Sequence, residues 1–360
     1  MYAAAIFHDN GNSMLMRSGN PALKDSTFLD LGSGAVVRGG DQVMTLNGAV
    51  NKTGILLLLA VMTAAFAWSQ VEFTPEGATN AMPSPAHALT IDVEDWFHIC
   101  GVGGALDKSQ WTALPSRVQP TTRALIDLLD RCGVRATFFV LGWVAERFPD
   151  LVATIVSAGH EIGSHGHMHD RVYELTPEMF GRDLDDSLRA LRGCGIQTIA
   201  GFRAPEWSIN GRSLWALDVL AARGIRLDSS MAPMRVVGDP RYPQDIHRRA
   251  TASGDIVECP PAVGRLFGAH VPMGGGWGLR SRRPAAVLRS LDRRLRAGRP
   301  AVVWLHPWEI DDDPPRVKLP AGLRFAHYFG LAGFRQRLET ILRGSSFAPL
   351  SHVARMSAAS

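Results

Sequence analysis

Short apolar runs alternate with amphipathic stretches along the chain from residue 88 onward. Seven of these runs predict buried strands, at 88–93, 136–142, 160–165, 198–203, 225–229, 255–260 and 301–306. Apolar residues at helical spacing between them predict helices at 120–133, 176–193, 210–224 and 284–300. Because repeated strand–helix units build a parallel sheet covered by helices, the pattern predicts an α/β fold, and seven strands favour closure into a barrel.

The ends of the predicted helices carry boundary signals. Thr176 is the expected N-cap of the helix at 176–193, with Pro177 in its first turn. Glycine adopts the left-handed conformation that ends a helix at low cost. We therefore expect helices to end at Gly133, Gly159, Gly193 and Gly224.

Polar residues stand at or near the C-terminal ends of five otherwise apolar strands: Asp92, His165, Arg203, Asp228 and His306. In a parallel α/β fold these strand ends share one face of the molecule, and active sites form on that face. We therefore expect the five side chains to converge on one site. Each of three residues also has a purely structural interpretation when taken alone. Arg203 could form a salt bridge, Asp228 could cap a helix, and His306 could be a buried histidine that is hydrogen-bonded to the backbone.

Three histidines occur within the segment "GHEIGSHGHMHD" (159–170). His165 and His169 are four residues apart, so they share a face of a helix, or of a turn entering one, and can bind one metal ion. A divalent metal site of this kind takes neutral imidazoles together with a carboxylate. Zinc is the expected ion, and cobalt or nickel fits the same donors.

The segment "DVED" (92–95) supplies the carboxylates. Side chains alternate along a strand, so Asp92 and Glu94 point to the same side, and one ligates the metal while the other acts as a base. Asp95 points to the other side if the strand continues, whereas a turn at this point recruits it as the ligand.

Together these residues predict metal-assisted hydrolysis. Asp92 takes a proton from the attacking water, and His306 gives a proton to the leaving amine. Arg203 is expected to orient Asp92 and to keep it ionised, because a nearby positive charge lowers the pKa of a carboxyl group. Asp228 is expected to hold His306 and favour its charged form.

Composition narrows the alternatives. Of the 360 residues 46% are hydrophobic and 20% are charged, which excludes general disorder. The net charge of +4 does not indicate a nucleic-acid partner. The four cysteines lie far apart and form no C-x-x-C pair, which argues against a structural zinc cluster and, in so long a chain, against a disulfide framework.

The beginning of the chain has a different texture. Residues 1–53 are rich in Gly, Asn, Ser and Asp, and an uncharged apolar stretch follows, for which we expect a helix at 54–70. Its apolar run is shorter than the ~20 residues that span a bilayer. The segment 16–70 resembles the start of a bacterial Bax-inhibitor-type membrane protein, but the further apolar spans of that family do not follow. It is therefore either a fused or wrongly assigned fragment or a genuine anchor that contacts a membrane through 54–70.

A Pro-rich joint, "NAMPSPAH" (80–87), precedes the first predicted strand. We accordingly expect an N-terminal extension at 1–81, a catalytic domain at 82–350 and a tail at 351–360. Met82 is then an alternative start of the protein.

Five motifs make residues ~86–350 resemble a NodB-type polysaccharide deacetylase of carbohydrate esterase family 4: "TIDVED" (90–95), "GHEIGSHGHMH" (159–169), "FRAPEW" (202–207), "LDSS" (227–230) and "VVWLHPWE" (302–309). The second motif is highly specific, whereas the fourth is a partial match. The resemblance implies a distorted (β/α)7 barrel with one bound metal. It also implies hydrolysis of carbon–nitrogen bonds other than peptide bonds, with His165 and His169 as metal ligands and His306 as the acid.

The chain departs from this family in its first motif. The family has two adjacent aspartates, but Val93 follows Asp92 here, so the metal carboxylate is Glu94 or Asp95, and strand alternation favours Glu94. The segments "TIDVEDWFH", "GFRAPEWSI" and "HPWEID" further resemble deacetylases found beside exosortase and exopolysaccharide gene clusters. That branch implies deacetylation of N-acetylated sugars during polysaccharide synthesis, by a cytoplasmic domain if residues 1–81 are not native and by a membrane-anchored one otherwise.

An N-acetylated glycan is the expected substrate, contacted by Pro205, Trp207 and Trp277. Trp277 belongs to "GGGWG" (274–278), which we expect to form a loop over the barrel mouth, where the indole stacks on a sugar ring or anchors the loop. Two other functions stay open: amide hydrolysis of a small nitrogenous substrate, and glycan binding without catalysis.

Overall fold

The computed structural model describes residues 85–98, 106–235, 237–266, 269–319 and 321–358, and two short strands nearer the N-terminus. The chain divides into two compact units, Met1–Pro83 and Ser84–Ser360, next to the boundary expected from the Pro-rich joint. In the first unit, β1 (Val36–Gly39) and β2 (Gln42–Thr45) form an antiparallel pair. The apolar helix expected at 54–70, with its membrane contact, lies outside the described residues. Among those that are described, no helix combines the length and apolarity needed to cross a bilayer.

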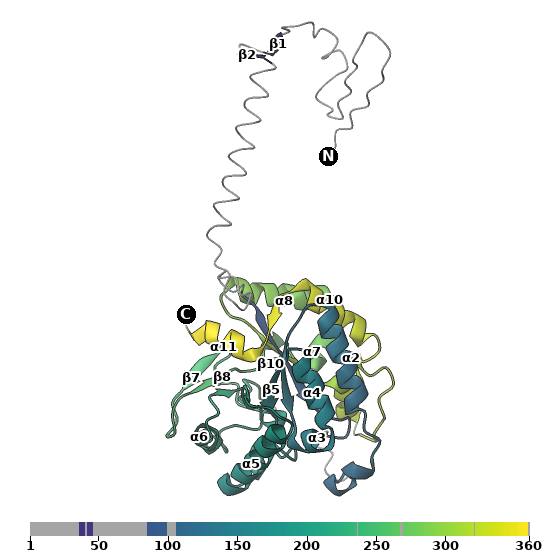
Figure 1. The fold of residues 1–360 in the computed structure, drawn as a ribbon, viewed down its shortest axis with the longest axis vertical. Helices are drawn as coiled ribbons and strands as arrows, with labels where there is room; N and C mark the ends of the chain where they lie inside the picture. The colour runs from purple at the N-terminus through teal and green to yellow at the C-terminus, as the bar shows by residue number, and fades with distance from the viewer. Residues whose placement is uncertain are drawn as a thin grey trace. The chain divides into compact units, whose positions relative to one another are not determined.

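A parallel sheet forms the centre of the second unit (Figure 1). Its strand order is β11 (Val302–Leu305), β3 (His87–Val93), β4 (Thr137–Val140) and β5 (Glu161–Ser164). The short strand β12 (Phe347–Ala348) also pairs with β3. Every residue of β3 is buried, as expected for a strand in the middle of a parallel sheet. The strands predicted at 88–93, 136–142, 160–165 and 301–306 correspond to these four central strands.

Beyond β5 the sheet continues through single bridges. Phe202 pairs with Ser164 on one side and with Asp228 on the other, and the path goes on to β6 (Leu227–Asp228), β8 (Ile256–Glu258) and β7 (His247–Arg249). The strand predicted at 198–203 is therefore reduced to one bridging residue, because the chain turns at Ala204 into a 3₁₀ helix. The Ala262 N–H donates to the Val302 carbonyl of β11 at 3.0 Å. Closure of the sheet into a seven-stranded barrel stays a prediction.

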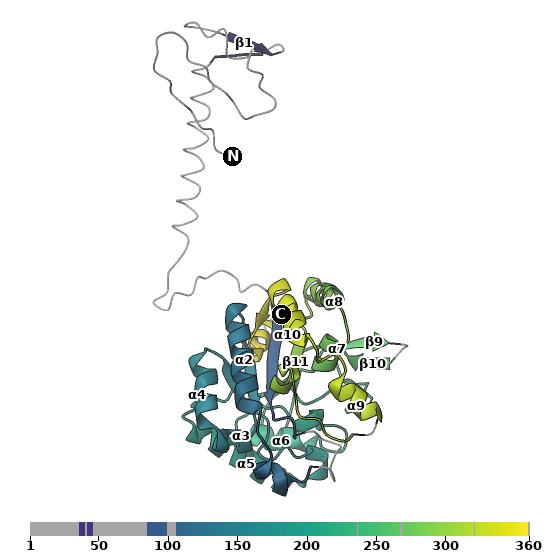
Figure 2. The ribbon, with the colours of Figure 1, turned by 90° about the vertical axis from the view of Figure 1, so that its right-hand side faces the viewer.

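Helices pack around the central strands (Figure 1 and Figure 2). Packing pairs are α2 with α4, α3 with α5, α5 with α6, and α8 with α10. The helices are α2 (Val118–Arg131), α3 (Gly142–Arg147), α4 (Pro149–Ser157), α5 (Pro177–Gly193), α6 (Trp215–Ala222), α7 (Gly276–Arg280), α8 (Pro284–Arg296), α9 (Ala321–Tyr328), α10 (Phe334–Gly344) and α11 (Leu350–Ala358). Short 3₁₀ helices are η2 (Lys108–Ala113), η3 (Val172–Glu174), η4 (Pro205–Trp207) and η5 (Pro307–Ile310).

The helix boundary signals are largely present. The Thr176 side chain accepts a hydrogen bond from the Met179 N–H at 3.2 Å and so caps α5. Gly133, Gly159 and Gly224 have positive φ angles at helix ends. α5 ends at Gly193 as expected, but the left-handed residue that follows this helix is Gly195, with φ of 85°.

Two segments differ from their predicted form. "GGGWG" leads into α7, which begins at Gly276, and is not an open loop. Its glycines allow close packing, because a Cβ atom on Gly275 would collide with Trp304. The expected tail at 351–360 contains most of α11, whose Leu350, Val353 and Ala354 are spaced along one face and buried in the core. The hairpin of β9 (Val263–Leu266) and β10 (Ala269–Pro272) was not predicted.

An aromatic cluster packs beside the C-terminal end of β3. Trp96, Phe97, Trp111 and Trp308 are buried together there. Large buried aromatic side chains contribute strongly to packing energy, so this cluster fixes the turn that follows β3. That turn carries Glu94 and Asp95, whose positions decide the chemistry described next.

Candidate active site

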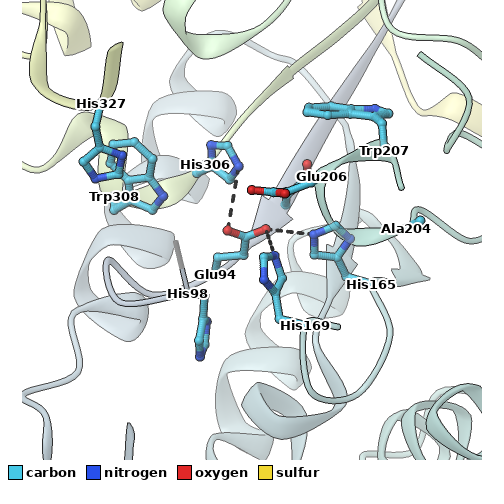
Figure 3. A pocket seen from close by; sticks show the side chains of 11 residues that line it. Glu94, His98, His165, His169, Ala204, Glu206, Trp207, His306, Trp308 and His327 are labelled. Atoms are coloured by element: carbon cyan, nitrogen blue, oxygen red, sulfur yellow. Dashed lines mark hydrogen bonds and ion pairs between the residues drawn. The ribbon is translucent and has the colours of Figure 1, made fainter. Parts of the chain in front are cut away.

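The C-terminal ends of β3, β5 and β11 border one cavity of about 160 Å³ (Figure 3). Six of the residues singled out from the sequence line it: Asp92, Glu94, His165, His169, Trp207 and His306. They come from four separate stretches of the chain. Parallel strands bring them to one face, since all the strands point their C-terminal ends the same way.

Glu94, His165 and His169 have the composition and spacing of a metal site. The Glu94 Oε1 atom lies 2.8 Å from His165 Nε2 and 2.9 Å from His169 Nε2 (Figure 3). Ligand atoms from all three residues lie within 4.8 Å of one another. His165 Nδ1 donates a hydrogen bond to the Arg203 carbonyl oxygen at 2.7 Å, which leaves the Nε2 lone pair facing the cluster. The donor set therefore fits a divalent ion of the zinc type.

The charge state of Glu94 suits a metal ligand. Burial alone would raise the pKa of this carboxyl group, but the imidazoles of His169, His306 and His165 outweigh burial and hold the pKa well below its usual range. Glu94 is therefore a carboxylate at neutral pH, and metal ligands must be deprotonated.

Asp95, the alternative ligand, points away from the imidazoles. Its carboxylate accepts hydrogen bonds from the backbone N–H groups of Arg117 and Val118 at 2.9 to 3.3 Å. Because α2 begins at Val118, Asp95 binds the free backbone N–H groups at the N-terminus of that helix. Burial raises the pKa of Asp95. Of the two carboxylates left open by the sequence, the structure places Glu94 beside the histidines.

Asp92 and Arg203 form a buried ion pair at the floor of the site. Arg203 Nη1 donates to Asp92 Oδ1 at 2.8 Å, and the two side chains are 0% and 3% exposed. Arg203 also donates to Thr90 Oγ1 at 2.9 Å and to Ser229 Oγ at 2.8 Å. With these partners the guanidinium group is held in one place, and Asp92 has a fixed counter-charge inside the protein.

His306 faces the metal cluster across the cavity. Its Nε2 atom lies 3.8 Å from Glu94 Oε2, and its Nδ1 atom lies 3.6 Å from Glu309 Oε2. Burial alone would lower the pKa of His306, but Glu94, Glu309 and Asp92 outweigh burial and raise that pKa to about 9. His306 is therefore a protonated imidazolium at neutral pH and has a proton to donate.

Glu309 was not singled out from the sequence, yet it anchors this histidine. Its Oε2 atom accepts the His306 backbone N–H at 3.0 Å, and its Oε1 atom accepts Arg280 Nε at 3.0 Å. A Cβ atom on Gly276 would collide with the Glu309 carboxylate, so glycine at that position makes room for it. The signal in the sequence was the glutamate three residues after the histidine in "HPWE".

Asp228 does not hold His306 as expected. Its contacts are the Ser230 hydroxyl, 2.5 Å from Asp228 Oδ1, and the carboxyl group of Glu258, and both acidic side chains are fully buried. Burial raises the pKa of Asp228, and burial together with the charge of Asp228 raises the pKa of Glu258 well above its usual range. The surroundings of Asp228 therefore favour a protonated carboxyl group beside Glu258 rather than a charged partner for His306.

The three expected substrate contacts are not equivalent. Trp207 lines the cavity and packs on Trp304 with ring centroids 4.1 Å apart. Pro205 is the buried first residue of η4, and Trp277 is half-buried in α7; neither borders the cavity. The wall also includes residues to which the sequence assigned no role: His98, Ala204, Glu206, Trp308 and His327.

Comparisons with known proteins agree with this geometry. Residues 107–225 match the family model for polysaccharide deacetylases, and residues 229–355 match the model of a domain of unknown function, DUF3473. The chain is 27% identical over 123 residues to a peptidoglycan-N-acetylglucosamine deacetylase of Bacillus cereus, which is 30% of this chain and 44% of the relative. It is 29% identical over 121 residues to a chitooligosaccharide deacetylase of a Bradyrhizobium species, which is 33% of this chain and 51% of the relative.

The chain thus spans about half the length of these curated relatives. Among solved structures, a Mycobacterium smegmatis protein assigned to the polysaccharide deacetylases has the same fold. Its TM-score is 0.54 at 22% identity, over 80% of this chain and 96% of that one. Residues 107–225 thus resemble a polysaccharide deacetylase domain, by the family model and the curated relatives, and the solved structure shares the fold.

Proposed function

We propose that this protein is a metal-dependent N-deacetylase that removes acetyl groups from an N-acetylated exopolysaccharide or its precursor. The observation that carries the proposal is the arrangement of Glu94, His165 and His169 opposite a buried carboxylate and a protonated imidazole. Ligand atoms of Asp92, Glu94 and His306 also lie within 4.8 Å of one another, so base, metal ligand and acid border one small volume.

Glu94, His165 and His169 would hold one divalent ion, with zinc preferred and cobalt or nickel fitting the same donors. A divalent ion at such a site supplies Lewis acidity toward an amide carbonyl group. The histidine tautomer set by the Arg203 carbonyl oxygen favours binding, because the ring nitrogen that faces the cluster carries a lone pair.

The proton transfers fall to Asp92 and His306. Asp92 accepts a proton from the attacking water while Arg203 holds its carboxylate in place. His306, charged because its carboxylate neighbours raise its pKa, donates a proton to the leaving nitrogen. Water and the acetamido group are thereby converted into acetate and a free amine.

The shape of the cavity favours a sugar ring. Trp207 and Trp308 line it, and flat aromatic faces suit the apolar faces of sugars. By their names, the curated relatives act on peptidoglycan N-acetylglucosamine and on chitooligosaccharides, so units of this kind are the first substrates to test. The sequence resemblance to deacetylases beside exopolysaccharide gene clusters supports a role in polysaccharide synthesis.

The test is acetate release from oligomers of N-acetylglucosamine by the purified full chain. We expect activity to disappear on chelation and to return with zinc or cobalt. Activity that chelators leave unchanged contradicts the metal role. Hydrolysis of ureides in place of acetylated sugars contradicts the glycan substrate.

A further inference from the structure

A carboxylate that takes no part in the proposed proton transfers reaches into the cavity. Glu206 lies in η4 and lines the wall together with Trp207. Figure 3 shows its carboxylate directed into the space bordered by His306, Glu94 and His165.

The backbone that presents this carboxylate is strained. Glu206 has φ of 54° and ψ of 26°, and Trp207 has φ of 49°. Residues other than glycine rarely adopt positive φ angles, and two in succession are rarer still. Such strain persists only where the surroundings impose it, and it concentrates at binding sites. The strain here places the acidic side chain and the indole ring of adjacent residues on the same cavity wall.

An arginine outside the cavity holds Glu206 from behind. Arg171 Nε donates to Glu206 Oε2 at 2.5 Å, and Arg171 Nη1 donates to Glu174 Oε1 at 3.3 Å. Arg171 does not border the cavity, whereas Glu206 does. The second oxygen of the Glu206 carboxylate, Oε1, has no hydrogen-bond donor within the part of the chain that the structure describes. One oxygen is therefore tethered and the other is left for a ligand.

Each other carboxylate in the cavity already has a partner. Asp92 is paired with Arg203, and Glu94 with the two imidazoles of the metal cluster. Among the described residues, neither lysine nor arginine lines the cavity. A carboxylate accepts hydrogen bonds from hydroxyl or amino groups and repels another carboxylate.

We propose that Glu206 is a specificity-determining residue that accepts a hydrogen bond from a hydroxyl group of the acetamido sugar and disfavours sugars that carry a carboxylate. The inference rests on the proposed deacetylase function and narrows its substrate to uncharged N-acetylhexosamine units. N-acetylated uronic acid units are the matching poor substrates.

The test compares two oligomers of equal length, one of N-acetylglucosamine and one whose C6 hydroxyl groups are oxidised to carboxylates. For the wild-type protein we expect kcat/KM for acetate release to be about tenfold or more higher on the neutral oligomer. In Glu206→Gln, which keeps an acceptor but loses the charge, we expect this preference to fall by about fivefold. The change should lie mainly in KM for the oxidised oligomer.

Glu174→Gln is the matched control, because it removes the other carboxylate of Arg171 outside the cavity and should leave the preference unchanged. Equal kcat/KM on both oligomers, or the same preference in Glu206→Gln as in wild type, overturns the inference while leaving the deacetylase intact. Calorimetric binding of both oligomers to the same three proteins gives an independent measurement. If neither oligomer releases acetate, the deacetylase proposal fails. The inference about Glu206 is then tested by binding alone: it holds if the wild type binds the neutral oligomer more tightly and Glu206→Gln loses this preference, and it fails otherwise.

Discussion

Glu309 Oε2 lies 3.6 Å from His306 Nδ1 and also accepts the backbone N–H of the same histidine at 3.0 Å. One carboxylate thus holds the main chain, and lies beside the ring, of the residue that we assign as the acid. Arg280 balances the charge of Glu309, so a row of alternating charges runs from α7 to the cavity. The position of the proton donor is set by a residue only three places away in the sequence.

Replacing Glu309 by Gln should slow catalysis more than it weakens substrate binding. The carboxylate helps to raise the pKa of His306, so its loss lowers that pKa and moves the alkaline limb of the kcat profile to lower pH. We expect kcat to fall by about 10- to 100-fold, the usual range for one positioned acid–base group, with KM little changed. A pH–rate profile measures this, with Glu339→Gln, which removes an exposed ion pair with Arg343, as the control. An unshifted alkaline limb contradicts the role of Glu309.

Asp92→Asn should abolish turnover while the protein stays folded and still binds glycan. Asn is nearly isosteric with Asp but cannot accept the proton of the attacking water, so we expect a loss of at least about 10²-fold in kcat. Stopped assays of acetate release together with glycan binding by calorimetry separate the two effects. Wild-type rates in this variant rule out Asp92 as the base.

Arg203→Ala should affect stability as well as activity. The guanidinium group is fully buried, and its removal leaves Asp92 as an unpaired buried charge, which costs about 3–5 kcal/mol. Urea unfolding of the variant measures the change. Combining it with Asp92→Asn should restore part of the lost stability, because the stranded charge is then gone. A loss below about 1 kcal/mol shows that water reaches the pair in solution.

Zinc should stabilise the fold through the three proposed ligands. A ligand that binds the native state alone stabilises it by about 4 kcal/mol at roughly a thousand times its Kd. We expect metal-stripped wild-type protein to gain melting temperature with added zinc, and His169→Ala to gain little. His352→Ala, which changes a histidine on α11 away from the cavity wall, is the control and should respond as wild type does. An equal zinc response in His169→Ala places the metal elsewhere.

The buried pair of Asp228 and Glu258 should make stability fall as pH rises. A carboxyl group with a raised pKa in the native state keeps a proton that the unfolded chain releases, so stability is lost above its ordinary pKa of 4.5 until the native pKa is passed. We expect Glu258→Gln to flatten this decline between pH 5 and pH 8, by about 1.4 kcal/mol per pKa unit removed. Urea unfolding at both pH values measures the change in stability, and Asp292→Asn, which replaces an exposed carboxylate, is the control. Parallel declines in both variants contradict a raised pKa of Glu258 in the native state.

Periodicity predicted the four central strands and the helices α2, α5, α6 and α8, because buried parallel strands read as apolar runs and surface helices as stripes. The strand at 198–203 was overestimated, since a run of apolar residues does not show where the chain turns, and the turn follows directly after Phe202 and Arg203. The helix in "GGGWG" was missed because glycine there serves close packing against Trp304, which depends on a residue distant in sequence.

Within the site, Asp92, His165 and His306 could be predicted from their positions at strand ends, because strand direction alone decides which face of the sheet a terminal residue reaches. The partner of His306 was not predictable in the same way. Asp228 also stands at a strand end, but it lies opposite Glu258 on the neighbouring strand and interacts with that carboxyl group. Pairing between strands distant in sequence decides such competition, and periodicity carries no information about it. Glu206 escaped notice because its inward direction comes from a backbone conformation that its residue type disfavours.

Gly276 contributes no atom to the cavity wall, yet the carboxylate of Glu309 fills the space where its side chain would stand. Adding one methyl group there would push the glutamate off its histidine while leaving every reacting group in the sequence. The pKa of His306 therefore depends on the absence of a side chain at Gly276, a helix residue that does not touch the cavity.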